Sequence, residues 1–454
     1  MARTLASRRS ESAVPSADRR PNILLLCADD HRADAIGGLG HPVLRTPNWD
    51  RLLRDGSAFT NTYTTVPICT PARGELLTGC DAFTNGVRWF GETLKPDLTL
   101  LPQAFAEAGY RTFFTGKWHN DGHPSERGYT ETRRVFCGGM TEHRMRFAEN
   151  GKTIMGFSSE LFAEAVNQFL EAQEDSETPW FAHVAFTAPH DPRTPPMGWR
   201  VDPRRIPLPP NFMPEHPFDN GEMTIRDEQL AGFPRTEDEI RQHLADYYGM
   251  LLHLDAQIGR ILAELDAVHQ RHQTIVVYTS DHGLAVGSHG LMGKMSMYDH
   301  SVRVPLLLRG PGIPEGERFD TLCMGYDLYP TLCDLCEIPV PQSVQQGKSL
   351  KPVLDAPPET HRDAVFCAYQ DVQRMVRTDR YKYIVYPKIG KEQLFDLQTD
   401  PDELTNLLDE WRFRPTPWYK PQEDGAKYQE IAATLRTRLQ DWQKSVGDTT
   451  IIAE

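Results

Sequence analysis

Asn22-Ile-Leu-Leu-Leu-Cys-Ala-Asp-Asp30 is the segment from which the fold class follows, because an unbroken apolar run stops abruptly at two carboxylates. A continuous apolar run of this length is typical of a strand that is buried on both faces of a parallel sheet. In open α/β sheets, ligands bind where such strands end. The pair Asp29 and Asp30 is therefore expected either to hold a metal ion or to form a solvated turn.

Three further segments repeat this arrangement of a buried strand followed by polar residues. The strands are 112–114, 180–186 and 274–279, and they lead into Gly116-Lys-Trp-His119, Thr187-Ala-Pro-His190 and Ser280-Asp-His-Gly283. The carboxyl ends of parallel strands share one edge of a sheet. We therefore expect a single site to contain Asp29, Asp30, Lys117, His119, His190, Asp281 and His282.

The segments between these strands have the pattern of covering helices. Residues 101–109 have a proline near their start and a glycine at their end, and residues 237–266 carry apolar side chains at helical spacing. A glycine-punctuated loop containing Lys294 leads to another strand at 304–308. The proline-rich segment 189–217 is expected to form part of the wall of the site. This order predicts an α/β fold with a large, mostly parallel sheet sandwiched by helices.

A second, smaller unit is predicted at the carboxyl end of the chain. An Asp-Ala-Pro-Pro stretch near residue 355 has the composition of a linker, and short alternating segments follow at 364–369, 381–386 and 393–397. We expect a small antiparallel sheet with a helix packed on it. The predicted units are a flexible tail at 1–20, a catalytic domain at 21–355 and a C-terminal α+β subdomain at 356–454. The aromatic loop 411–419 of this subdomain is expected to dock the two domains or, alternatively, to border the active site.

Charge and cysteine content exclude several classes of protein. The chain has 454 residues with 49 basic and 63 acidic side chains, so its net charge is −14. Such a charge argues against binding to nucleic acid or to an anionic membrane surface, and no apolar run is long enough to cross a bilayer. The eight cysteines lack the spacing of a disulfide framework. Free thiols and a tail without an apolar signal segment predict a cytoplasmic protein.

The stretch Pro67-Ile-Cys-Thr-Pro-Ala-Arg-Gly74 places a cysteine at the expected start of a helix. We expect Thr70 to cap this helix and Pro71 to occupy its first position, so that the free amide groups point toward Cys69. A helix start favours an anion, and Arg73 adds a fixed guanidinium. These residues predict chemistry on a sulfate or a phosphate group.

Taken in order, the motifs resemble those of the type I sulfatases of the alkaline phosphatase superfamily. Cys69-Thr-Pro-Ala-Arg73 fits the C-x-P-x-R signature of that family, and Leu77-Thr-Gly79 follows at the usual distance. Residues 22–30, 116–119, 188–190, 280–283 and 303–305 resemble further blocks in the correct order, and Leu394-Phe-Asp-Leu397 resembles the C-terminal subdomain. The resemblance covers most of residues 21–400.

The resemblance implies a cofactor, a modification and a set of roles. A maturation enzyme would convert Cys69 to formylglycine, whose hydrated aldehyde attacks the sulfur of a sulfate ester and later expels sulfate. The metal ligands would be Asp29, Asp30, Asp281, His282 and the modified Cys69, with Ca²⁺ as the expected ion and Mg²⁺ or Mn²⁺ as alternatives. Arg73 and His119 would orient the diol, and the groups binding sulfate or protonating the leaving alcohol would be Lys117, His190 and Lys294.

Two departures from the family pattern leave alternatives open. Many sulfatases have asparagine at the position of His282, and histidine there also occurs in relatives that hydrolyse phosphonate monoesters and phosphodiesters, so this hydrolase activity is the alternative function. Asn120-Asp-Gly-His123 replaces the usual Leu-Gly after His119, which predicts an altered pocket wall. The expected substrate is a sulfated carbohydrate, with small sulfate esters as the alternative. The candidate substrate-binding residues are Arg88, Trp89, His123 and Arg303.

Overall fold

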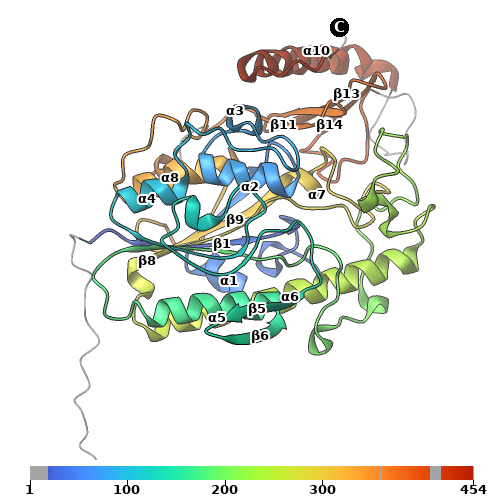
Figure 1. The fold of residues 1–454 in the computed structure, drawn as a ribbon. Coiled ribbons are helices and arrows are strands. Elements are labelled where there is room, and N and C mark those ends of the chain that lie inside the picture. Colours follow the sequence, from blue (N-terminus) through green and yellow to red (C-terminus); the bar gives the residue numbers. More distant parts are fainter. Residues whose placement is uncertain (1–18, 357–359, 409–420, 453–454) are drawn as a thin grey trace, which may run out of the picture.

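A computed structural model describes residues 19–356, 360–408 and 421–452, and these form a three-layered α/β structure with a smaller sheet at one side (Figure 1). The central sheet has eight strands in the order β10-β2-β9-β8-β1-β7-β3-β4. Only β9 runs antiparallel to its neighbours β2 and β8. The predicted fold class is confirmed. The predicted tail lies almost wholly outside the described residues, as does the aromatic loop 411–419.

The strands of the central sheet have the bounds β1 (Asn22–Ala28), β2 (Ser57–Tyr63), β3 (Arg111–Lys117), β4 (Glu131–Phe136), β7 (Trp180–Ala185), β8 (Thr274–Ser280), β9 (Arg303–Arg309) and β10 (Glu317–Met324). Every residue of β1, β7 and β8 is buried. Their continuous apolar sequences follow from this position, because helices cover both faces of the sheet.

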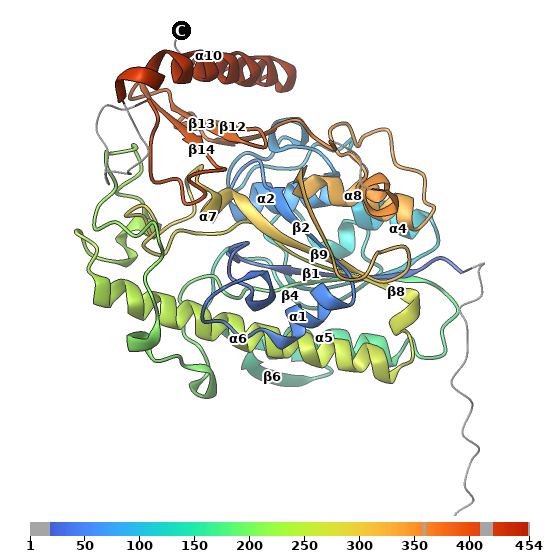
Figure 2. The same cartoon turned by 180° about the vertical axis from the view of Figure 1, so that it is seen from behind.

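Helices cover the sheet on both sides, as Figures 1 and 2 show from opposite directions. One layer contains α1 (Pro47–Arg54), α5 (Ser158–Glu171) and the long α6 (Glu237–Ala267), with the hairpin of β5 (Arg144–Glu149) and β6 (Lys152–Phe157) beside α5. The other contains α2 (Cys69–Thr78), α4 (Leu101–Glu107) and α8 (Leu328–Leu335). The short helices are α3 (Ala82–Asn85), α7 (Asp299–Val302) and α9 (Lys351–Asp355). No helix among the described residues is both long and apolar enough to span a membrane.

The small sheet is antiparallel, as predicted, and has four strands: β11 (Val365–Tyr369), β12 (Gln373–Arg377), β13 (Tyr381–Tyr386) and β14 (Lys391–Asp396). The sequence pattern had not indicated β12, because its residues Gln-Arg-Met-Val-Arg are buried but not apolar in alternation. One face of this sheet packs on α10 (Pro421–Val446) through Leu435 and Leu439. The other face joins a core that also contains Tyr63 and Ile68. The small sheet is thereby fixed against the region that carries α2.

The start of α2 differs from the sequence prediction. The helix begins at Cys69, two residues earlier than expected, and its N-cap is Ile68, whose carbonyl accepts the Ala72 amide at 3.0 Å. The prediction that Thr70 caps the helix is wrong, since its hydroxyl has no hydrogen-bond partner among the described residues. All ten residues of α2 are buried. Cys69 is therefore held rigidly at the first position of a buried helix.

Candidate active site

Three carboxylates meet where β1 and β8 end. The parallel register pairs Ala28 with Ser280, so Asp29 and Asp281 follow their strands side by side. Asp30 adopts a left-handed conformation with φ of 70°, and its backbone amide donates to Asp281 Oδ1 at 3.2 Å. Such a conformation is uncommon outside glycine but is tolerated by aspartate. The local turn thus directs Asp29, Asp30 and Asp281 toward one point.

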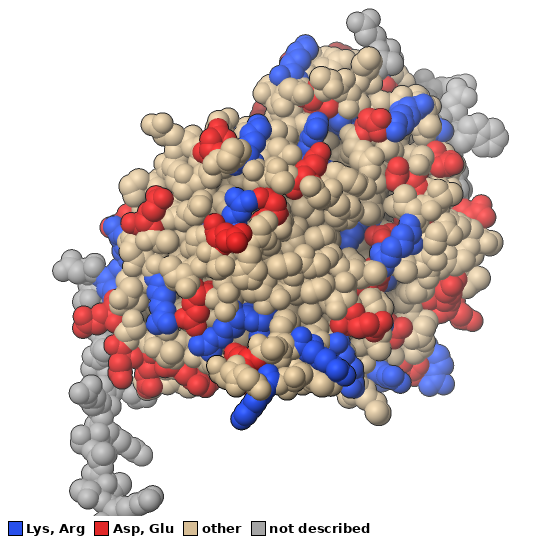
Figure 3. Space-filling model, in the orientation of Figure 1, with Lys and Arg blue, Asp and Glu red and all other residues tan. Residues whose placement is uncertain are grey.

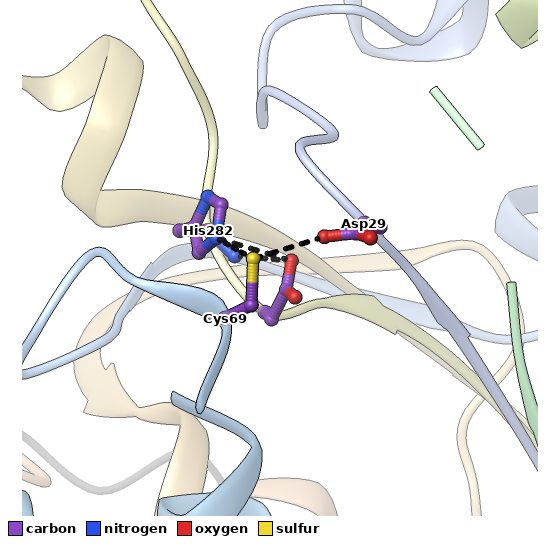
Figure 4. Close-up of side chains that lie close together, drawn as sticks. Asp29, Cys69 and His282 are labelled. Carbon is purple, nitrogen blue, oxygen red and sulfur yellow. Dashed lines mark hydrogen bonds and ion pairs between the residues drawn. The ribbon is translucent and has the colours of Figure 1, made fainter. Parts of the chain in front are cut away.

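The thiol of Cys69 lies at this point. Its Sγ is 3.4 Å from Asp29 Oδ1, 3.4 Å from His282 Nε2 and 3.4 Å from Lys294 Nζ. Figure 4 shows the sulfur facing both the His282 ring and the Asp29 carboxylate. The residue is only 1% exposed. The structure therefore brings Cys69 together with residues that follow the ends of β1 and β8.

Buried cations balance the carboxylates one by one. Lys117 Nζ lies 2.6 Å from Asp29 Oδ2, and Lys294 Nζ lies 2.9 Å from Asp30 Oδ1. Arg73 contacts Asp281 Oδ2 at 2.9 Å and donates to the Lys117 carbonyl at 3.0 Å. Acidic and basic groups are interspersed on the face of the molecule in Figure 3. Within the site, three buried cations are each paired with a carboxylate.

The electrostatic environment changes the protonation of the site. Burial opposes ionisation of the Cys69 thiol, but Lys117, Lys294 and His282 outweigh it and hold the pKa of Cys69 well below its usual value. Burial also favours a neutral His282 ring, but the Asp281 carboxylate raises the pKa of His282 to about 9. Such perturbed groups in one cluster are typical of active sites.

The donor set fits a divalent metal ion. Asp29, Cys69, Asp281 and His282 offer ligand atoms within 4.8 Å of one another, and so do Asp29, Asp30, Cys69 and His190. His282 Nδ1 lies 3.0 Å from the Gly283 carbonyl, an interaction that leaves Nε2 as the ligand nitrogen. Carboxylate oxygens are the preferred ligands of Ca²⁺ and Mg²⁺. The two sets together offer three carboxylates, the thiol of Cys69 and two ring nitrogens, and the carboxylates suit an oxygen-preferring cation.

Two further histidines border the same space. His119 has φ of 54°, its ring stacks on Phe90 with a centroid separation of 5.6 Å, and burial lowers its pKa. His190 Nδ1 lies 2.7 Å from the Asp191 carbonyl, which orients its ring. Both side chains line a cavity of about 500 Å³ that reaches Cys69 and Lys294. The structure therefore brings all six predicted catalytic residues to one site.

The wall of this cavity includes residues that the sequence motifs did not reveal. They are Met140, Glu222, Arg226, Asp227, Tyr369 and Gln370. Of the proline-rich segment 189–217 only His190 lines the cavity, so the expectation that this segment forms the wall is largely wrong. Glu222 accepts a hydrogen bond from the Tyr369 hydroxyl at 2.8 Å, and Arg226 forms ion pairs with Asp191 and Asp227. In the sequence, only the polar run 226–228, which lies within an irregular region, could have indicated residues of the cavity wall.

The four predicted substrate-binding residues separate into two pairs. Trp89 lines the cavity, and Arg88 lines an adjoining one. His123 instead caps a turn, with Nδ1 2.8 Å from Ser125 Oγ. Arg303 contacts Asp299 at 3.2 Å and borders a different cavity. The structure thus does not bring His123 and Arg303 to the cavity of Cys69, because local partners hold both side chains elsewhere.

Comparison with known proteins agrees with this geometry. The sequence profile of the family described as Sulfatase matches residues 21–338, which is more than half of the chain. The chain belongs to the sulfatase family. A second profile, described as the C-terminal region of N-sulphoglucosamine sulphohydrolase, matches residues 287–417 of this sulfatase.

Individual relatives span nearly the whole sulfatase. An ulvan-active sulfatase of Formosa agariphila is 30% identical over 417 residues, covering 86% of this chain and 77% of the relative. An N-acetylglucosamine-6-O-sulfatase of Bacteroides thetaiotaomicron is 28% identical and covers 86% and 83%. A protein solved in complex with its substrate D-glucosamine-2-N,6-O-disulfate has a TM-score of 0.79 at 25% identity, covering 95% and 99%. The sulfatase is therefore a sulfuric ester hydrolase.

Proposed function

We propose that this sulfatase removes sulfate from a saccharide, with a formylglycine made from Cys69 as nucleophile and a divalent cation, Ca²⁺, as cofactor. The observation that carries the proposal is the position of Cys69 Sγ, 3.4 Å from Asp29, His282 and Lys294 at the end of a cavity of about 500 Å³. Relatives whose names or complexes contain sulfated glucosamine support the substrate class.

The metal would be held by Asp29, Asp30, Asp281 and His282, with the modified residue 69 as a further ligand. A cation bound there supplies Lewis-acid chemistry, which lowers the pKa of a hydroxyl and offsets the charge of sulfate. The buried lysines and arginine of the chain supply fixed positive charge for the sulfate oxygens. Lys294 Nζ is the best placed of them, since it lies 3.4 Å from Cys69 Sγ, the position that an oxygen of the modified residue would take.

We assign the proton transfers to the two histidines that line the cavity, His119 and His190. Burial lowers the pKa of His119, which favours the neutral ring, and we assign this ring the role of accepting a proton from the diol. His190, oriented by the Asp191 carbonyl, would donate to the leaving alcohol. We expect His190→Ala to lower kcat more for poor alkyl leaving groups than for a nitrophenolate, because only the former needs a proton in the transition state.

Modification of Cys69 must precede burial of α2. The thiol is 1% exposed and sits at the start of a helix whose ten residues are all buried. A maturation enzyme would therefore have to reach the segment around Cys69 while it is unfolded. The expected result is that refolded, unmodified protein stays inactive when the maturation enzyme is added, whereas co-expression yields active protein.

Hydrolysis of phosphonate monoesters or phosphodiesters is the second candidate, and His282 is the residue that favours it. Side-by-side assays on aryl sulfate and aryl phosphonate esters separate the two functions. Faster turnover of the sulfate ester supports the proposal, and dominant turnover of the phosphonate would overturn it. Cys69→Ala is the control, since it removes the nucleophile for either substrate and should abolish both activities.

A further inference from the structure

A second cavity adjoins the cavity of Cys69. It has a volume of about 400 Å³ and shares Trp89 and Gln370 with the first cavity, so these two residues form the boundary between them. Its other walls come from Arg88, next to α3, and from the turn and tail residues Asp371, Thr449 and Thr450. The two cavities lie next to each other, with Trp89 and Gln370 in the lining of both.

The walls of the second cavity are fixed by their own contacts. Arg374 binds Asp448 at 2.6 and 2.9 Å and Thr450 Oγ1 at 2.5 Å, which ties the tail after α10 to β12. The Trp89 ring packs against Phe90 at 5.0 Å and Tyr369 at 6.0 Å. Glu92 accepts the backbone amides of Arg88 and Trp89 at 2.5 and 2.8 Å. The cavity is therefore preformed, which lowers the entropic cost of binding.

The charges leave one cation available to a ligand. The Arg374 guanidinium is already paired with Asp448, and Asp371 is paired with Lys388 at 2.6 Å. Arg88 is exposed, lies over the Phe83 ring at 5.9 Å, and has no ion-pair partner among the described residues. The Glu92 carboxylate, which also lines the cavity, accepts the backbone amides of Arg88 and Trp89, so the Arg88 guanidinium is the charged group of the lining that can pair with an anionic ligand.

The remaining groups suit a sugar ring. Gln370, Thr449 and Thr450 offer amide and hydroxyl groups, and Trp89 and Phe83 offer aromatic surface. A few polar groups set among aromatic side chains are typical of small-molecule sites. We propose that this cavity binds the saccharide unit next to the sulfated one, and that a carboxylate or sulfate group of that second unit pairs with Arg88. This inference rests on the proposed carbohydrate function and extends it to an anionic substrate of two or more units.

The test compares kcat/KM of the metal-loaded, formylglycine-containing enzyme on five substrates. They are an aryl sulfate, a sulfated monosaccharide, the corresponding disaccharide with a neutral second unit, and disaccharides whose second unit carries a carboxylate or a sulfate. We expect the anionic disaccharides to exceed the monosaccharide by about tenfold or more, the size of one charge-assisted hydrogen bond. Which of the two anions gives the larger value identifies the group that pairs with Arg88.

The variant Arg88→Gln should reduce the preference for anionic over neutral disaccharides to about twofold or less, because it removes the charge but keeps a polar side chain. Arg204→Gln is the matched control, an exposed arginine that pairs with Asp202 and lines neither cavity. Equal rates for mono- and disaccharides, or an anion preference that survives in Arg88→Gln, would overturn the second subsite. Turnover of the aryl sulfate without turnover of any saccharide would instead overturn the carbohydrate function, and the subsite with it.

Discussion

The substitution Lys294→Met removes the buried cation that lies 2.9 Å from Asp30 Oδ1 and 3.4 Å from Cys69 Sγ. Two unit charges at 2.9 Å attract by about 6 kcal/mol at an effective dielectric constant of about 20. The cost of ion-pair desolvation reduces the net value, and removing one partner of a buried pair costs about 3–5 kcal/mol. His282 Nδ1, 3.3 Å from the same oxygen, remains as a partner, so we expect about 3 kcal/mol in the metal-free protein.

Two assays measure this change. Thermal unfolding of the metal-free protein should show a lower melting temperature for Lys294→Met. Saturating Ca²⁺ should restore more stability to the variant than to the wild type, because the ion neutralises the buried Asp30 carboxylate that has lost Lys294. In the metal-loaded, modified enzyme, kcat for an aryl sulfate should fall by about 100-fold to 1000-fold, since a preorganised charge at the developing anion is lost.

A matched control separates the role of Lys294 from a general effect of losing a lysine. Lys444→Met removes an exposed lysine whose contact with Asp441 is 3.4 Å long, and we expect little change in melting temperature or kcat. The reasoning is refuted if Lys294→Met unfolds at the same temperature as the wild type without metal, or if its kcat stays within about twofold of the wild-type value.

Three further substitutions or conditions test other parts of the site. The His282 pKa of about 9 exceeds its unfolded value, so the stability from protonated His282 is present below about pH 6.5 and is lost as the pH rises through about 9. Ca²⁺ must displace this proton to bind the His282 ring. Calorimetry should therefore show that the affinity for Ca²⁺ rises between about pH 6.5 and 9 and that binding releases a proton. The variant His282→Asn should lose this pH dependence. Gly116 has φ of 111°, and a Cβ there would lie 1.9 Å from the Ala185 carbonyl oxygen. Gly116→Ala should therefore lower the melting temperature and displace Lys117. Unchanged activity of this variant would contradict the reasoning. Arg226→Ala should raise KM for saccharide substrates more than for an aryl sulfate, which parallel steady-state assays would reveal.

The fold and the metal cluster could be predicted from the sequence because both depend on local patterns. The apolar run before Asp29 indicates a buried parallel strand, and the common edge of parallel strands brings Asp281 and His282 beside it. The same reasoning placed Lys117 at the end of β3 and His190 after β7. A few apolar strands thus specify where chemically distinct side chains will meet.

The cavity wall could not be predicted, because it depends on how loops and the small sheet pack against the sulfatase core. Glu222 and Arg226 lie in an irregular region without a periodic pattern, and Tyr369 reaches the cavity from β11. His123 and Arg303 have the residue types of a substrate site, but nearby Ser125 and Asp299 hold their side chains. Residue type and proximity in sequence do not determine side-chain direction. Likewise, the start of α2 at Cys69 left the Thr70 hydroxyl without its expected capping role.

The most direct test of the central claim is peptide mass spectrometry of the segment around Cys69, performed on preparations whose sulfate-releasing activity is also measured. Preparations made with and without a maturation enzyme should contain different fractions of the aldehyde at residue 69. We predict that kcat for a sulfate ester rises in proportion to the aldehyde fraction and is lost in Cys69→Ala. Full sulfate-ester hydrolysis by protein in which residue 69 is entirely the thiol would contradict the account.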